Sequence, residues 1–115
     1  MKEYLLLFWN ESGKGQYQLD PEKMKEGMAA WQRWVGNIAL QGKLISTKPI
    51  QWDGALVTNE GVHPQPAIKE NQLVTGYMIC KASNLEEVKE WASTCPILQS
   101  PKGCTEIREV APFEV

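Results

Sequence analysis

Residues 20–43 carry the strongest periodic pattern in the sequence, and this pattern predicts a helix. Asp20 can cap the helix at its start, Pro21 suits the first helical position, and Gly42 can end it. Apolar residues then recur at steps of three and four, so they share one stripe of the helix. The stripe consists of Met24, Met28, Trp31, Val35 and Ile38. We interpret it as packing surface for the core rather than as a cofactor site, while Trp34, one step off the stripe, could face either way.

Short apolar runs before and after this helix predict the strands of a sheet. The run near the middle of the chain is the longest and has the alternation of a central strand. The predicted strands cover residues 3–9, 43–50, 54–59, 73–82 and 104–113. Asp53-Gly54 is a turn signal between the second and third of these strands, and residues 59–72, with two prolines, read as a loop.

A second amphipathic helix is predicted over residues 83–96. Ser83 and Glu86 have the spacing of a capping box, and Pro96 stops the helix. The order of elements is a βαββαβ plan with an extra β-hairpin, in an α+β protein of one domain, residues 1–115. An antiparallel sheet with helices on one face leaves its other face to be covered. We expect a second copy to cover it, which makes the protein a homodimer with a pocket between sheet and helices or at the seam.

Charge and cysteine content argue against several functional classes. The net charge is -2 and no basic block occurs, so nucleic acid is not an expected partner, because phosphate neutralisation needs clustered Lys and Arg. No apolar stretch approaches a membrane span or a signal peptide, which makes the cytoplasm the expected location. Cys80, Cys95 and Cys104 are odd in number and fit no zinc pattern, so we expect reduced thiols, no metal and no cofactor.

Four stretches form a recognisable set in this order along the chain. They are MKEYLLLFW, MAAWQRWVGNIALQGKL, VTGYMICKASNLEEVKEWASTCPIL and EIREV. Together they resemble the YCII-related family, in particular its DGPF branch, and the resemblance runs through nearly the whole chain. It implies a ferredoxin-like plan and a dimeric α+β barrel, which agrees with the predicted order of elements.

Two positions depart from what this resemblance implies. The branch carries an Asp-Gly-Pro-Phe motif ahead of the Gly-Tyr strand. Aligned without gaps, that motif falls on residues 64–67, Pro-Gln-Pro-Ala, where only Pro66 remains. The wider family implies a histidine on the first helix, at about the position of Trp31. Enzymatic activity is suspected in the family because of a His and Asp pair, and neither member is in place here.

Candidate catalytic residues therefore come from elsewhere in the chain. His63 is the only histidine, lies beside the altered motif, and can exchange a proton near neutral pH. Tyr77 could aim its phenol into the cavity, and Asp53 could assist. The competing interpretation is a solvated loop residue for His63 and a packed residue with a satisfied hydroxyl for Tyr77.

Candidate ligand-binding residues are Trp9, Trp52 and Gly76. A glycine in the central strand would leave room for a ligand. The two tryptophans could stack on a flat ligand at the rim of a cavity, or they could anchor the partner subunit at the seam.

Two functions follow as hypotheses. The first is a small cytoplasmic homodimer, not an enzyme, whose apolar, aromatic-rimmed cavity binds a small organic ligand or serves a regulatory role. The second is an enzyme of the isomerase or lyase type, in which His63 acts as the base and Tyr77 or Asp53 helps. Fold alone does not choose between them.

Overall fold

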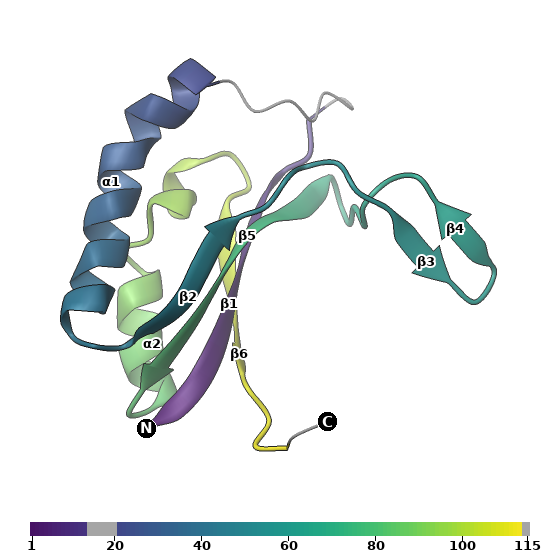
Figure 1. Ribbon diagram of the computed structural model, residues 1–115. Coiled ribbons are helices and arrows are strands. Elements are labelled where there is room, and N and C mark those ends of the chain that lie inside the picture. The colour runs from purple at the N-terminus through teal and green to yellow at the C-terminus, as the bar shows by residue number, and fades with distance from the viewer. Residues whose placement is uncertain (14–20, 114–115) are drawn as a thin grey trace.

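The computed structural model describes residues 1–13 and 21–113, and its centre is a four-stranded antiparallel sheet with the order β2-β5-β1-β6. The strands are β1 (Lys2–Glu11), β2 (Leu44–Pro49), β5 (Gln72–Ala82) and β6 (Cys104–Glu109). The helices α1 (Pro21–Leu40) and α2 (Leu85–Ala92) and the short 3-10 helix η1 (Pro96–Gln99) lie on one side of the sheet (Figure 1). This mixed α+β arrangement is consistent with the predicted ferredoxin-like plan.

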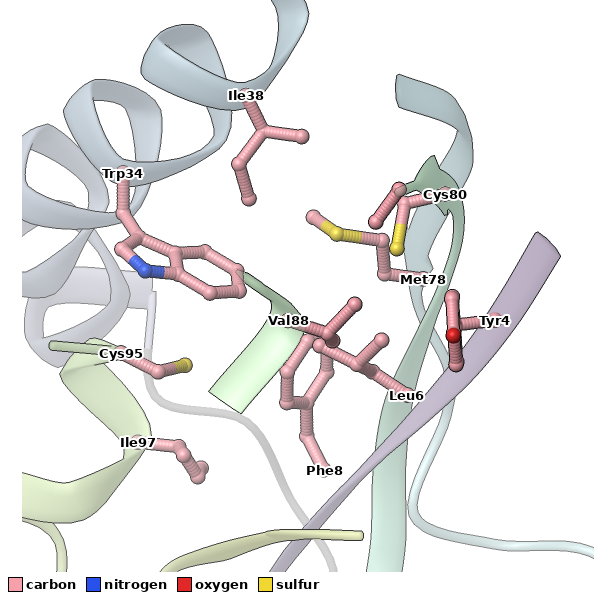
Figure 2. Close-up of a cluster of buried hydrophobic side chains, with 11 residues drawn as sticks. Tyr4, Leu6, Phe8, Trp34, Ile38, Met78, Cys80, Val88, Cys95 and Ile97 are labelled. Carbon is pink, nitrogen blue, oxygen red and sulfur yellow. The ribbon is translucent and has the colours of Figure 1, made fainter. Parts of the chain in front are cut away.

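The hydrophobic core fills the space between the sheet and the helices. Tyr4, Leu6 and Phe8 of β1 are buried and alternate with half-buried neighbours, because successive strand residues point to opposite faces. The other core residues are Trp34, Ile38, Met78, Cys80, Ala82, Val88, Cys95 and Ile97 (Figure 2). Since each fully buried aliphatic side chain contributes about 1.5–3 kcal/mol, the helix side of the sheet supplies most of the hydrophobic stabilisation.

Three aromatic rings decide how α1 sits on the sheet. Phe8, Trp31 and Trp34 meet edge to face, with centroid separations of 5.1, 5.9 and 5.7 Å. The indole N–H of Trp34 donates a hydrogen bond to the carbonyl oxygen of Trp91 at 2.9 Å, so this large side chain is buried with its polar atom satisfied. The helix is turned accordingly, and Met28, which the periodicity placed on the core stripe, is 43% exposed.

The ends of α1 agree with the sequence where the structure describes them. The helix ends at Leu40, and Gly42 follows with φ of 70°, the left-handed conformation that favours glycine after a helix. The predicted cap, Asp20, lies outside the described residues, and so does the side chain of Met24. Within the described residues, neither helix combines the length and apolarity that crossing a membrane requires.

The cap of α2 lies one residue later than the predicted Ser83–Glu86 box. Asn84 has an extended backbone, and its side-chain oxygen accepts a hydrogen bond from the backbone N–H of Glu87 at 3.0 Å. The Glu87 carboxylate in turn accepts from the backbone N–H of Ser83 at 3.4 Å. Glu87 thus reaches back to the residue before the N-cap, not to the N–H of Asn84 as in a capping box, so only half of the predicted pattern is present, one residue later.

A two-stranded ribbon, β3 (Leu56–Thr58) and β4 (Gly61–His63), stands apart from the main sheet. We call residues 51–68, which contain it, the arm. Two predictions were wrong here. The hairpin turn lies at Asn59–Glu60 rather than at Asp53-Gly54, and the predicted loop over residues 59–72 contains β4. Local chemistry explains the turn, because the Thr58 hydroxyl accepts from the backbone N–H of Glu60 at 3.1 Å.

The arm projects from the sheet on the side opposite the helices (Figure 1). Residues 110–113, which we call the C-terminal segment, leave the other end of the sheet on that same side. The helix side of the sheet is thus packed, while the opposite side has two extensions beside it.

Candidate functional site

The side of the sheet turned away from the helices is the candidate functional surface. Strand alternation and register assign its residues. We call it the open face; it comprises Glu3, Leu5, Leu7 and Trp9 of β1, Tyr77, Ile79 and Lys81 of β5, Ser46 and Lys48 of β2, and Cys104, Glu106 and Arg108 of β6. Its apolar side chains are half-buried, since only their strand neighbours cover them. An apolar centre with a charged border is typical of a surface that meets a partner or ligand.

Trp9 marks the end of the open face nearest the arm. The register between β1 and β5 shifts just before it, so that Phe8 faces Gly76 and Trp9 faces Val74. Its indole N–H donates to the Glu106 carboxylate at 3.1 Å, which holds the ring over β6. An open pocket of about 320 Å³ lies here, lined by Trp9, Lys69, Glu70, Gln72, Cys104, Thr105 and Glu106. The combination offers a flat apolar wall beside charged groups.

Tyr77 and Ser46 form a polar pair on the open face. Their hydroxyl oxygens lie 3.2 Å apart, and either can be the donor. Lys48 stands opposite Tyr77 in the register of β2 and β5. A hydroxyl pair beside an ammonium group can donate and accept hydrogen bonds to the oxygen atoms of a ligand. The sequence predicted that the Tyr77 phenol points into a cavity; the structure places it on the open face, and the cavity stays a prediction.

Gly76 faces the other way, into the core. A Cβ atom there would meet the carbonyl oxygen of Lys48 at 3.3 Å and Cδ2 of Phe8 at 3.4 Å. The space that the sequence assigned to a ligand at Gly76 is filled by the Phe8 ring and the backbone of β2. The glycine is therefore required for close packing of strands and ring, and the structure offers no room for a ligand at this point.

The other predicted site residues belong to the arm or its root. His63 ends β4 and pairs with Leu56, and it is exposed. Asp53 is exposed, and Trp52 is half-buried at a bend after β2. The strand that ends at His63, β4, stands apart from the main sheet (Figure 1), and among the described residues no hydrogen bond or ion pair joins His63 or Asp53 to Tyr77.

The position that the family resemblance implies for a helix histidine is occupied by packed aromatic rings. Trp31 contacts Phe8 at a centroid separation of 5.1 Å and Trp34 at 5.7 Å. The residues in place of the Asp-Gly-Pro-Phe motif, 64–67, lie on the arm. At the implied histidine position there is thus a packed tryptophan, and the implied aspartate position lies in the arm, outside the core.

The three thiols lie in two environments. Cys80 is fully buried, and burial, followed by the negative charge of Glu87, raises the pKa of its thiol from 9.0 to about 11. Burial also raises the pKa of the Cys95 thiol. Cys104 is exposed on the open face, opposite Trp9 in the register of β1 and β6. Among the described residues, no cluster of three or more His, Cys, Asp or Glu side chains is arranged to hold a metal ion.

Comparison with known proteins bears on family and fold. The family model described as the YCII-related domain matches residues 5–114. A comparison with curated proteins finds no match. Among solved structures, the chain is similar to the 5-chloro-2-hydroxyhydroquinone dehydrochlorinase of Burkholderia phenoliruptrix AC1100, solved in complex with 2,5-dihydroxybenzoquinone. The TM-score is 0.52, the identity is 14%, and 93% of each chain is covered. At this identity the likeness shows the fold alone.

Proposed function

This chain belongs to the YCII-related family, and we propose that it is a cytoplasmic homodimer that binds a small organic molecule in a chamber between the open faces of two copies. The stretches that resemble the DGPF branch favour a divergent member of that branch. The observation that carries the proposal is the open face itself, an apolar sheet surface whose partly covered side chains border hydrogen-bonding groups.

Burial of apolar surface is the force expected to drive the assembly. Leu5 and Leu7 of β1 and Ile79 of β5 form the apolar centre of the open face. Transfer of such side chains out of water is favourable by roughly 25 cal/mol per Å². A second copy is the simplest cover, because a two-fold dimer places the same apolar surface on both sides of the seam.

The polar groups on the open face indicate the class of ligand. The Tyr77–Ser46 hydroxyl pair and Lys48 suit ligand oxygen atoms, while Trp9 provides a flat surface for stacking. A small, flat, oxygenated ring combines these features. The similar dehydrochlorinase was solved with 2,5-dihydroxybenzoquinone, which makes this compound a reasonable probe for binding.

The assembly is tested by light scattering on the parent protein and on two matched variants. Leu7→Glu places a charge at the apolar centre of the open face, whereas Leu40→Glu makes the same change at a site on α1 that is 87% exposed. We expect dimers for the parent and for Leu40→Glu, and monomers for folded Leu7→Glu. A parent protein that is monomeric at micromolar concentration would overturn the proposed assembly, and a Leu7→Glu variant that remains dimeric would remove the open face from it.

A second candidate function is proton-transfer catalysis of the isomerase or lyase type. It is favoured by the Tyr77–Ser46 pair, since a phenol hydrogen-bonded to a second hydroxyl can serve as a general acid or base. In this version His63 and Asp53 would be supplied by the arm of the partner subunit. Chloride release from 5-chloro-2-hydroxyhydroquinone by the parent protein, abolished in Tyr77→Phe and in His63→Ala, is the expected result. Binding of 2,5-dihydroxybenzoquinone without such turnover would favour the non-enzymatic function.

A further inference from the structure

The arm is an apolar ribbon that its own chain leaves uncovered. Val57 and Val62 face each other across β3 and β4 and are 72% and 69% exposed. A two-stranded hairpin without a packing partner is marginally stable in water. The radius of gyration is 15.2 Å, whereas a compact domain of this length has about 13 Å, which agrees with a projecting element. Burial of these apolar side chains against a partner would be favourable.

Backbone hydrogen bonds anchor the chain at both roots of the arm. On the β2 side, the backbone N–H of Ile50 donates to the carbonyl oxygen of Thr75 at 3.0 Å. On the β5 side, Lys69 and Gln72 exchange two backbone hydrogen bonds of 2.9 Å around a tight turn. These bonds fix the backbone at the two points where the arm leaves the sheet, Ile50 and Lys69.

The C-terminal segment is the matching feature at the other end of the sheet. It leaves β6 where the backbone N–H of Val110 donates to the carbonyl oxygen of Glu3 at 2.9 Å, next to the start of β1. Val110 is 41% exposed and Phe113 is 79% exposed. Like the arm, the segment lies on the open-face side of the sheet (Figure 1). Each chain thus carries one uncovered apolar extension at each end of its open face.

When two open faces pack with their strands aligned, the two-fold axis can lie in two ways. With the axis parallel to the strands, arm meets arm; with the axis perpendicular to the strands, the arm of one chain meets the C-terminal segment of the other. The charge of the arm favours the second arrangement over the first. The arm contains Asp53 and Glu60 and no Lys or Arg, so two arms would repel.

The strand residues at the far end of the sheet carry a net charge of only +1, and part of it is engaged within the chain, since Lys2 lies 3.6 Å from Glu109 and Arg108 lies 3.4 Å from Glu106. These strand residues are Lys2, Glu3, Lys81, Arg108 and Glu109, three basic and two acidic side chains. We propose that each arm packs against a second copy of this chain in a head-to-tail arrangement, which we call the clasp. This proposal rests on the dimer proposed above. The Val57–Val62 pair of the arm packs against the C-terminal segment of the second copy, around Phe113.

Disulfide trapping between two differently tagged chains tests this arrangement. Both chains carry Cys104→Ser, which removes the exposed native thiol; one also carries Val57→Cys and the other Phe113→Cys. We expect a covalent dimer when the co-expressed pair is purified and treated with a mild oxidant, and none when either chain, produced alone, is treated in the same way. Self-linking of the Val57→Cys chain as the main product would show arm-to-arm packing and overturn the proposal.

Disulfide trapping and light scattering together distinguish a failure of the clasp from a failure of the proposed open-face dimer. A stable dimer by light scattering without any Val57–Phe113 disulfide would overturn the clasp and leave the open-face dimer standing. A monomeric protein would overturn both.

Shortening the arm gives an independent measurement. A Cβ atom on Gly54 would lie 3.7 Å from Cβ of Pro66, so the two sides of the arm are close at its base, and residues 55–65 can be replaced by two glycines. The shortened chain is expected to keep its circular dichroism and to dimerise roughly tenfold or more weakly. A folded shortened chain with an unchanged dissociation constant would count against the clasp.

Discussion

The ammonium group of Lys43 lies 2.9 Å from both carboxylate oxygens of Glu87, and this pair ties the start of β2 to α2. The two side chains are 18% and 25% exposed, and the Lys43 ammonium also stands 5.8 Å from the centroid of the Trp91 ring. The hydrogen bond from Lys43 holds the pKa of Glu87 below its ordinary value. The pair therefore contributes to folding in a way that depends on pH.

Replacing Lys43 by methionine is expected to lower the free energy of unfolding by about 1–2 kcal/mol at pH 7, because a partly buried carboxylate loses its partner. A lowered carboxyl pKa gives stabilisation that is complete above the ordinary glutamate value of 4.5 and is lost as the pH falls through the lowered value. The difference between parent and variant should therefore shrink on acidification. Urea titrations at pH 7 and pH 3 measure it.

Lys89→Met is the matched control for this prediction. Lys89 contacts Glu86 at 3.0 Å, but these side chains are 55% and 76% exposed, so solvent screens the pair. We expect little change in stability from this variant. Equal decreases in the free energy of unfolding of the two variants would show that the Lys43–Glu87 pair stabilises the fold no more than an exposed ion pair does.

The thiols are predicted to differ in reactivity. A thiol-specific reagent at pH 8 should modify Cys104 in the folded protein and all three cysteines in denaturant, since Cys80 and Cys95 are buried and burial raises the pKa of both. Mass spectrometry of the labelled peptides identifies the site. Rapid modification of Cys80 in the native protein would contradict the packing described for β5.

Alkaline pH should weaken the fold through Cys80. Its pKa of about 11 in the folded chain lies above the ordinary 9.0, so the stabilisation is complete below the unfolded value and is lost as the pH rises through the folded one. The free energy of unfolding is expected to fall between pH 9 and pH 11, less steeply in Cys80→Ala than in the parent. Cys104→Ala, at an exposed thiol, should retain the parental slope.

Gly76→Ala is expected to destabilise the chain by about 1 kcal/mol. The added methyl group would press on the Phe8 ring and on the backbone of β2, and well-packed cores tolerate extra atoms poorly. Gly36→Ala on α1 is the control, because no atom lies within 4 Å of the new Cβ and alanine favours a helix. Thermal unfolding should show a lower midpoint for the first variant and a higher one for the second.

Tyr77→Phe tests the polar pair on the open face. If the phenol binds a ligand oxygen, the dissociation constant for 2,5-dihydroxybenzoquinone should rise roughly fivefold to tenfold, the effect of losing a hydrogen bond of about 1 kcal/mol. Thr47→Val is a suitable control, since Thr47 lies on the neighbouring strand and donates to the backbone carbonyl of Tyr77 at 2.8 Å without belonging to the open face. Equal affinities for parent and Tyr77→Phe would remove the phenol from the site.

Periodicity was sufficient to locate both helices and the four strands of the main sheet. Residues 4–9 are an unbroken apolar run, which predicts a strand without telling its two faces apart; only the structure shows that Tyr4, Leu6 and Phe8 face the core. Predictions based on single residues were less secure. Met28 lies on the predicted stripe of α1, yet it is 43% exposed, while Trp34, one step off the stripe, is buried against Phe8 with its indole N–H bonded to the carbonyl oxygen of Trp91.

The candidate site depended much more on the tertiary structure. Nothing local to Ser46, Tyr77 or Glu106 signals that strands far apart in sequence bring them to one face, because cross-strand register arises only when the sheet forms. The same holds for His63, which local sequence places beside a strand and the fold places on an arm. Composition and periodicity alone were enough to predict an α+β domain in which one face of the sheet is not covered by the helices. Which side chains share that surface, and which extensions flank it, was decided by pairings between residues distant in the chain, and their energies depend on contacts that no single segment contains.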